Sequence, residues 1–153
     1  MKYTVQIEIN LPRQKVIDLF DAPENLPKWQ KGLISFENIS GDPGQPGAQS
    51  RLLFKMGKGT MEMIETITKR DLPEVFDGTY EAPGVFNVVK NRFIVVGENR
   101  TRWESENEFR FTTIMMKCIG FFMQSAFPKQ SLKYLKDFKS FAEEGIDVRN
   151  AGS

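Results

Sequence analysis

Alternation of apolar and polar side chains dominates the first two thirds of the chain. In residues 2–10 every second side chain is apolar, namely Tyr3, Val5, Ile7 and Ile9. This period of two predicts a strand with one buried face. The pattern returns in six further segments, at 33–40, 49–57, 60–70, 75–82, 85–96 and 101–112. Short turns rich in glycine and proline separate them and force neighbouring strands to run antiparallel, which predicts a seven-stranded antiparallel sheet.

Helical spacing appears between the first two strands and again at the C-terminal end. Pro12 suits a first helical turn, the run after it ends at residues 21–23, and a second short helix is expected near residues 24–30. A C-terminal stripe consists of Ser131, Tyr134, Leu135, Phe138, Phe141 and Ala142. It predicts a long helix that packs on the sheet through its aromatic side. Pro128 is expected to kink this helix or to separate it from the apolar segment 114–127.

These elements predict an α+β protein in which a strongly curved antiparallel sheet wraps a long C-terminal helix. Two short helices lie between the first and second strands. The 153 residues have the usual length of one domain, which we assign to residues 1–146, with residues 147–153 as a frayed tail. The apolar segment 114–127 is shorter than the ~20 residues that a membrane crossing needs. We therefore expect no transmembrane segment, although peripheral contact with a membrane is compatible with this segment.

Charge and cysteine content narrow the classes of function. The 21 lysines and arginines nearly balance the 20 aspartates and glutamates, and no basic run alternates with aromatic residues. Nucleic-acid binding is therefore not expected. The single cysteine, Cys118, excludes an internal disulfide and fits a reducing compartment, while the N-terminal residues lack the apolar stretch of a signal peptide. The expected location is the cytoplasm.

The absence of histidine restricts the chemistry most strongly. It removes every catalytic triad that uses histidine and every zinc or iron site with a histidine ligand. Acid–base chemistry then falls to carboxylates, tyrosine or lysine, and we expect neither a metal nor a cofactor. The chain also holds 13 phenylalanines and seven methionines. Methionine in particular suits an adaptable apolar cavity, although an ordinary core rich in phenylalanine accounts for the same composition.

The order of elements is similar to the helix-grip architecture of the SRPBCC superfamily, which includes START domains, polyketide cyclase-like proteins and plant pathogenesis-related allergens. The resemblance covers nearly the whole chain and is carried by the segments LPRQKVIDLFDAPENLPKWQ, GDPGQPGAQSRLLFKMG, GTYEAPGVFNVVKNRF and SLKYLKDFKSFAEE. It implies a ligand cavity between the concave face of the sheet and the long helix. It transfers no catalytic residues, because the superfamily shares no single active-site motif.

One candidate group consists of neutral polar residues on the predicted inner face of the last two strands. Asn87, Asn91, Ser105 and Asn107 share this face with aromatic residues such as Trp103 and Phe109. An unpaired amide in an apolar enclosure costs about 1 to 3 kcal/mol, so these groups are candidates for binding water or the polar atoms of a ligand. The alternative is that they hydrogen-bond one another or face water at an open end.

A second candidate is the carboxylate of Glu65. It has the same strand parity as Met61 and Met63, and Tyr80 on the next strand is expected to face it. A carboxylate among methionines has a raised pKa and can act as an acid or a base. The alternatives are that a bulge turns Glu65 outward or that a salt bridge holds it at the rim.

The third candidate is the apolar segment 115–127. Three interpretations remain open from the sequence: the first turns of the core helix, a mobile lip over the pocket, or a surface that contacts membranes or a partner protein. Of these, burial in the core is the interpretation that the apolar composition favours.

The predicted lining of the pocket combines these groups. It consists of Met61, Met63, Glu65, Tyr80, Asn87, Asn91, Trp103, Asn107 and Phe109, closed by Phe127, Tyr134 and Phe138. Such a lining, apolar with few polar groups, favours the binding or carriage of a small hydrophobic molecule that is lipid-like or aromatic and polyketide-like. One alternative is a metal-free cyclase- or dehydratase-like lyase or isomerase that uses Glu65 with Tyr80 as its catalytic groups. Another is a co-chaperone-like regulator that docks through residues 115–127.

Overall fold

The computed structural model describes residues 1–150. Its strands are β1 (Lys2–Ile9), β2 (Leu33–Ser40), β3 (Gln49–Met56), β4 (Gly59–Asp71), β5 (Val75–Ala82), β6 (Val85–Gly97) and β7 (Arg100–Phe111). Its helices are α1 (Arg13–Phe20), the 3-10 turn η1 (Pro23–Asn25), α2 (Leu26–Trp29), α3 (Ile114–Phe122) and α4 (Ala126–Glu144). Each predicted strand is present within one or two residues of its expected bounds.

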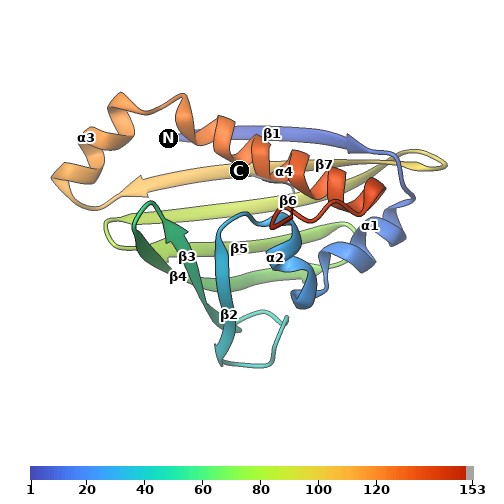
Figure 1. Cartoon of the computed structure of the whole chain (residues 1–153), viewed down its shortest axis with the longest axis horizontal. Helices are drawn as coiled ribbons and strands as arrows, with labels where there is room; N and C mark the ends of the chain where they lie inside the picture. The colour runs from blue at the N-terminus through green and yellow to red at the C-terminus, as the bar shows by residue number, and fades with distance from the viewer. Residues whose placement is uncertain (151–153) are drawn as a thin grey trace.

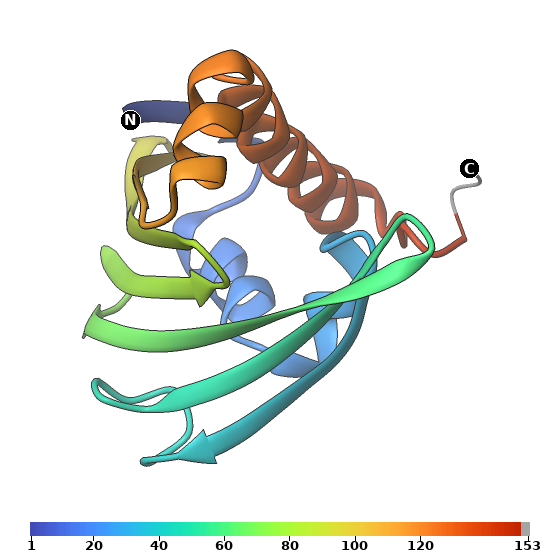
Figure 2. The same ribbon diagram turned by 90° about the vertical axis from the view of Figure 1, so that its left-hand side faces the viewer.

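The strands form one antiparallel sheet in the order β1-β7-β6-β5-β4-β3-β2 (Figure 1). Consecutive strands from β2 to β7 are neighbours, because each connection is a short turn. The first strand pairs with the last one, so β1 forms one edge of the sheet and β2 forms the other. Figure 2 shows that the sheet curves around the side on which the helices lie. The α+β helix-grip prediction is confirmed.

The register of β6 and β7 follows from strand parity. Lys90 lies opposite Glu106 and Arg92 lies opposite Glu104, so basic and acidic side chains face one another across the two strands. A bulge between Val95 and Gly97 adjusts the pairing next to the turn. The ion pair that Arg92 forms is nevertheless with another strand, because its Nη1 contacts Oδ1 of Asp77 on β5 at 2.6 Å.

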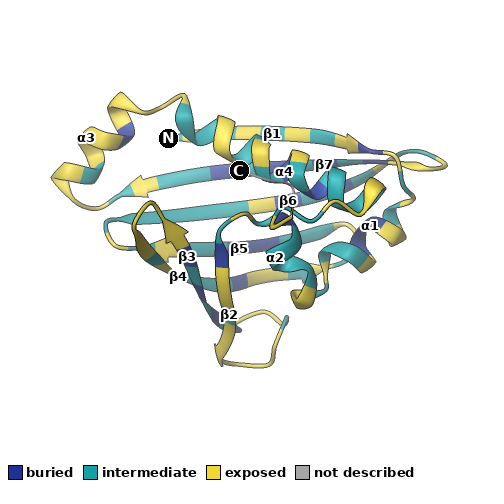
Figure 3. Cartoon of the chain, in the orientation of Figure 1, coloured by how far each residue is buried: buried dark blue, intermediate teal, exposed yellow. Residues whose placement is uncertain are grey.

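An aromatic core lies between the sheet and the helices. Phe93, Trp103 and Phe138 are almost fully buried there, and they contact Phe20 and Trp29 through mostly edge-to-face ring pairs. In Figure 3 the dark blue segments of β6, β7, α1 and α4 mark this region. Ring pairs of this kind add about 0.5 to 1.5 kcal/mol each to the stabilisation from burial. This core holds α4 along β1 and against α2.

The apolar segment after β7 forms a helix of its own. Thr113 caps α3, because its Oγ1 accepts a hydrogen bond of 3.1 Å from the backbone N–H of Met116. Helix α3 ends at Phe122, and a turn at residues 123–125 leads into α4. Pro128 lies in the first turn of α4, where proline is tolerated. The apolar segment and the long helix are separate, but the break precedes Pro128 by three residues, and Phe127 belongs to α4 rather than to the separated segment. The preferred interpretation of residues 115–127 as the first turns of the core helix is wrong, because most side chains of α3 are exposed (Figure 3).

The end of the chain returns to the second helix. The backbone N–H of Val148 donates a hydrogen bond of 2.9 Å to the carbonyl oxygen of Lys28, so this part of the predicted tail lies against α2. Residues 151–153 of that tail lie outside the described residues. No helix among residues 1–150 combines the length and the apolar character needed to cross a bilayer.

Candidate functional site

A row of directly paired residues crosses five strands on the inner face of the sheet. Ser50 lies opposite Glu65, Glu65 opposite Tyr80, Tyr80 opposite Asn87, and Asn87 opposite Phe109. Residues directly opposite one another project on the same side of a sheet, so the row forms a continuous line of side chains. We call Glu65, Tyr80 and Asn87 the polar row.

Glu65 points inward, as its strand parity predicts. The bulge of β4 lies between Ile67 and Lys69, beyond Glu65, so it does not reverse the facing of the carboxylate. The Tyr80 hydroxyl donates a hydrogen bond of 2.7 Å to Glu65 Oε2. Glu65 forms no ion pair with any residue from 1 to 150, so the alternative of a salt bridge at the rim is wrong.

The pKa values of Glu65 and Tyr80 both lie above their ordinary values. Burial raises the pKa of Glu65, and the hydrogen bond from Tyr80 lowers it only in part. Burial, followed by the negative charge of Glu65, raises the pKa of Tyr80 well above its usual value. A carboxyl group of this kind binds a proton more readily than an exposed one and can donate or accept a proton toward a bound molecule.

The three asparagines of the predicted lining have different roles in the structure. Asn91 Oδ1 accepts a hydrogen bond of 2.9 Å from Trp103 Nε1, and Asn107 Nδ2 donates one of 3.1 Å to Ser105 Oγ. Asn87 Oδ1 is buried and has no hydrogen-bond partner among residues 1–150. A buried acceptor without a partner costs about 1 to 3 kcal/mol. Asn87 is therefore the residue of this set with an unused polar atom beside Tyr80.

Apolar residues flank the polar row on both sides. On the β3 side Leu33, Leu52 and Phe54 form a second hydrophobic cluster, against which Met63 and Tyr80 pack. Met61 lies next along β4 and is partly buried. The polar row therefore lies between this second cluster and the aromatic core.

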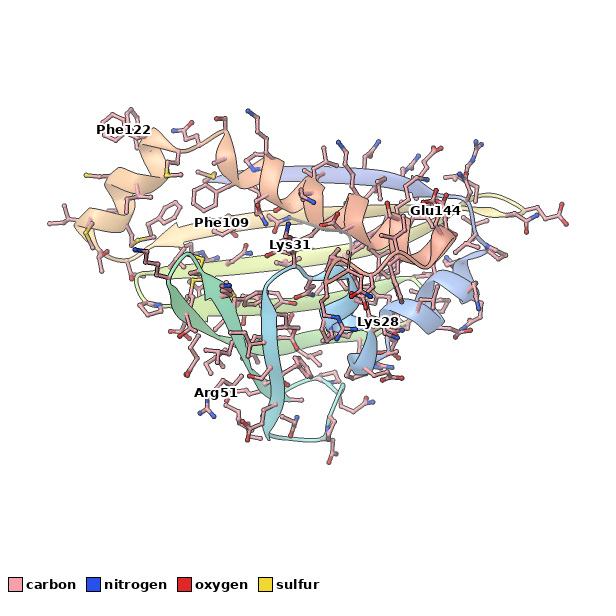
Figure 4. The ribbon with its side chains drawn as sticks, in the orientation of Figure 1. Lys28, Lys31, Arg51, Phe109, Phe122 and Glu144 are labelled. Carbon is pink, nitrogen blue, oxygen red and sulfur yellow. The ribbon has the colours of Figure 1, made fainter. Side chains whose placement is uncertain are left out.

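Aromatic rings continue from the polar row toward α3 and α4. Phe109 stacks near Tyr3, with ring centroids 6.0 Å apart, and contacts Phe127 of α4 at 4.8 Å. Phe111 follows at 6.2 Å from Phe109 and at 5.7 Å from Phe127. Figure 4 shows Phe109 between β7 and the start of α4. These rings form an apolar path along one end of the concave face.

Some predicted lining residues belong to the packed interior. Trp103 and Phe138 are 3% and 0% exposed and lie within the aromatic core, so they support the concave face from one side. Tyr134 on α4 lies outside that core and is partly buried. Burial raises the pKa of its hydroxyl, which a hydrogen bond with Gln130 opposes.

Two hollows on the surface lie away from the predicted lining. The first, of about 350 Å³, is bounded by Glu62, Glu81 and Phe86 among others. The second, of about 340 Å³, is bounded by Asp18, Asp21 and Arg70 among others. Neither contains a residue of the predicted lining. The concave face differs from both in having inward side chains, buried or partly buried, on every strand of the row.

Residues 1–141 match the family described as polyketide cyclase / dehydrase and lipid transport. The chain belongs to this family. The match confirms the resemblance to the SRPBCC superfamily that the order of elements indicated. No curated protein matches the chain by sequence.

Solved structures share the fold of this member of the polyketide cyclase / dehydrase and lipid transport family. The Zhui aromatase/cyclase from Streptomyces sp. R1128 superimposes with a TM-score of 0.77 at 14% identity, covering 100% of this chain and 98% of that one. A protein from Thermus thermophilus gives 0.75 at 15% identity, covering 99% and 100%. Truncated norcoclaurine synthase from Thalictrum flavum gives 0.72 at 13% identity, covering 94% of each.

The fold brings three further residues to this site that the sequence analysis did not include in the lining. Ser50 stands opposite Glu65 at the end of the row, and Phe111 extends the aromatic path. Tyr3 joins β1 to α4, because its hydroxyl lies 2.6 Å from Ser131 Oγ. Strand parity already placed Tyr3 and Phe111 on the inner face. Their contacts with α4 could not be predicted from strand parity, because parity gives no register between a strand and a helix.

Proposed function

We propose that the chain binds or carries a small hydrophobic molecule, lipid-like or aromatic and polyketide-like, on the concave face between the sheet and α4. The apolar body of the molecule lies against Met61, Met63, Phe109 and Phe127. A polar atom of the molecule meets the polar row. The bound molecule is small enough to lie between the second hydrophobic cluster and the aromatic core.

The observation that carries this proposal is the unpaired Asn87 Oδ1 in a polar row that apolar residues flank. A hydroxyl or amide hydrogen on a ligand would satisfy that oxygen, while Tyr80 on the next strand and Glu65 on the strand after it offer a second hydrogen-bonding position. Apolar sites with a few placed polar groups are the usual form of small-molecule sites. Methionine side chains adapt their shape easily, so Met61 and Met63 allow the face to open around a ligand.

Native mass spectrometry of protein purified from its source cell tests this proposal directly. We expect a mass additional to that of the chain, which organic extraction removes. A neutral phenylnaphthylamine fluorophore then serves as a probe in titrations of the emptied protein. We expect Asn87→Leu to weaken retention of the natural ligand, and Met63→Lys to abolish binding of both ligand and probe by placing a charge on the apolar face.

Matched changes on the outer face control for general damage. Lys90 lies on β6 like Asn87, and Glu62 lies on β4 like Met63, but the side chains of Lys90 and Glu62 are exposed. Lys90→Leu and Glu62→Lys are therefore the control variants. These two variants should bind like the wild type. The proposal fails if no ligand copurifies and the fluorophore binds equally to Met63→Lys and Glu62→Lys, with thermal unfolding showing that both variants are folded.

Acid–base catalysis is a second candidate function, favoured by the inward carboxyl group of Glu65. As a base, Glu65 would take a proton from the carbon beside a ligand carbonyl. The electron pair of the broken C–H bond would form a carbon–carbon double bond while the π pair of the carbonyl group moves to its oxygen, and the same carboxyl group would return the proton to carbon. The raised pKa of Glu65 suits it to both directions of transfer. The chemistry would be that of an isomerase or of a cyclase- or dehydratase-like lyase.

Exchange of carbon-bound hydrogen in D₂O separates catalysis from binding. With β-tetralone as the probe ketone, we expect the protein to accelerate deuterium incorporation above the spontaneous rate. Glu65→Gln should remove the acceleration and keep the affinity for the fluorophore, whereas Glu62→Gln on the outer face should change neither. Equal acceleration by wild type and Glu65→Gln would exclude this role for Glu65 and leave the binding proposal standing.

A further inference from the structure

Helix α3 presents its apolar side to the outside of the molecule. Ile114 and Phe122 are each 82% exposed, Met115 is 70% exposed and Phe121 is 68% exposed. The opposite side of the helix rests on the sheet, where a Cβ added at Gly120 would lie 2.5 Å from the Phe111 ring. Figure 4 shows Phe122 directed away from the body of the protein. Most apolar side chains of α3 therefore face outward, whereas a surface helix usually turns its apolar face toward the core.

The charged residues of the chain segment that carries α3 are all basic. Residues 109–136 contain no aspartate or glutamate, and their basic residues are Arg110, Lys117, Lys129, Lys133 and Lys136. Arg110 pairs with Glu108 and Lys133 pairs with Asp137. Lys117, Lys129 and Lys136 form no ion pair with any residue of the described chain. The exposed apolar residues of α3 are therefore accompanied by positive charge that is not neutralised.

From this combination we infer that α3 and the first turns of α4 dock on a lipid bilayer that contains anionic lipids. Aromatic and aliphatic side chains with lysines at their border are the features of a helix that lies in the interface of a membrane. Anionic headgroups attract the lysines, and the acyl region takes up Phe121 and Phe122. The inference does not depend on the proposed ligand, because it rests on residues outside the polar row.

Charge argues against a second copy of the chain as the occupant. A symmetric pair of α3 helices would bring Lys117 of one copy toward the same basic surface of the other, and like charges at an interface oppose association. A bilayer with anionic headgroups complements this surface. Docking through α3 would also place the aromatic path from Phe111 to Phe109 next to the membrane, so a hydrophobic molecule has a short route to the concave face.

Flotation with vesicles of stated composition tests the inference. We expect the wild type to float with vesicles of phosphatidylcholine and phosphatidylglycerol, to bind much less to phosphatidylcholine alone, and to dissociate as salt is added. Phe121→Ser with Phe122→Ser should weaken binding by at least about tenfold. Lys117→Gln and Lys129→Gln should each weaken it by about fivefold.

Two exposed apolar residues elsewhere provide matched controls. Ile34 on β2 and Val95 on β6 are 56% and 55% exposed, so Ile34→Ser and Val95→Ser remove similar apolar surface far from α3 in the sequence. Both should bind vesicles like the wild type. Equal binding by the Phe121→Ser, Phe122→Ser variant and these controls would overturn the inference. So would a dimer in sedimentation velocity that this variant dissociates and that anionic vesicles leave intact.

Cys118 supplies a second readout, because it is the single cysteine and lies exposed on α3. A polarity-sensitive bimane label on Cys118 should shift its emission to shorter wavelength with anionic vesicles and stay unchanged with phosphatidylcholine alone. An emission spectrum that no anionic vesicle alters would contradict insertion of this helix. Because the label reports on α3 alone, this result is independent of whether the concave face holds a ligand.

Discussion

The Tyr80 hydroxyl donates a 2.7 Å hydrogen bond to Glu65 Oε2 across the pairing of β4 and β5. The two side chains stand directly opposite each other on the concave face, so strand register alone brings them together. Burial raises the pKa of Glu65, and this hydrogen bond is the interaction that opposes the rise. The protonation state of Glu65 therefore depends on Tyr80.

Removing the hydroxyl of Tyr80 should raise the pKa of Glu65 further. In Tyr80→Phe the carboxylate loses its hydrogen-bond donor and keeps the burial that disfavours its charge. A ¹³C NMR titration of the glutamate side-chain carboxyl groups measures the change, and Glu65→Gln identifies the signal by its disappearance. A pKa of Glu65 that is unchanged or lower in Tyr80→Phe would contradict the assigned role of the hydrogen bond.

Glu65 should make the protein less stable as the pH rises. Its pKa in the folded protein lies above the usual value of 4.5, so between these two values the folded state retains a proton that the unfolded state releases. Stability from this group is complete below 4.5 and is lost as pH rises through the folded-state pKa. Glu65→Gln cannot titrate. Urea unfolding should show that wild type loses stability relative to Glu65→Gln over this interval, and a difference independent of pH would contradict the expectation.

Strand parity was sufficient to predict most of the polar row. Alternation placed Glu65 inward with Met61 and Met63, and the short turns between β4, β5 and β6 placed Tyr80 and Asn87 beside it. The prediction held because the irregularity of β4 falls after Ile67. A bulge between Met63 and Glu65 would have turned Glu65 away from the methionines, and nothing in the alternation of residues 60–70 fixes the position of the bulge.

Asn87 and Asn91 should respond oppositely to substitution by leucine. Asn91→Leu leaves the buried Trp103 Nε1 without an acceptor and should lower the free energy of unfolding by about 1 to 3 kcal/mol. Asn87→Leu removes an oxygen that has no partner in the described chain, so it should leave stability unchanged or raise it. Chemical denaturation of both variants checks this contrast. Equal destabilisation by the two changes would show that Asn87 has a structural role.

The position of α3 was not predictable from its composition. A helix that is apolar around most of its circumference is typical of a buried segment, and the sequence of residues 114–122 is compatible with burial or exposure. What decides between them is the available space. The aromatic core already fills the region between β1, β7 and α4, and Gly120 lets α3 pack closely on Phe111 at the end of β7.

The contrast between core and surface phenylalanines gives a direct test of this arrangement. Phe138 is 0% exposed and packs against Trp29 and Trp103, so Phe138→Ala should cost about 3 to 5 kcal/mol of stability. Phe122 is mostly exposed, and Phe122→Ala should change stability by less than about 0.5 kcal/mol. Urea unfolding measures both. A large loss for Phe122→Ala would mean that α3 packs against the body.

Tyr3 should hold the start of α4 against β1. Its hydroxyl donates to the carbonyl oxygen of Phe127 at 3.2 Å and lies 2.6 Å from Ser131 Oγ. Tyr3→Phe and Ser131→Ala should each cost about 1 kcal/mol, and the double variant should cost less than their sum, because either change breaks the same bond. Unfolding of the four proteins gives the coupling energy. If the two losses add fully, the hydroxyl groups do not interact, and the ring contacts among Tyr3, Phe109 and Phe127 are what joins α4 to the sheet.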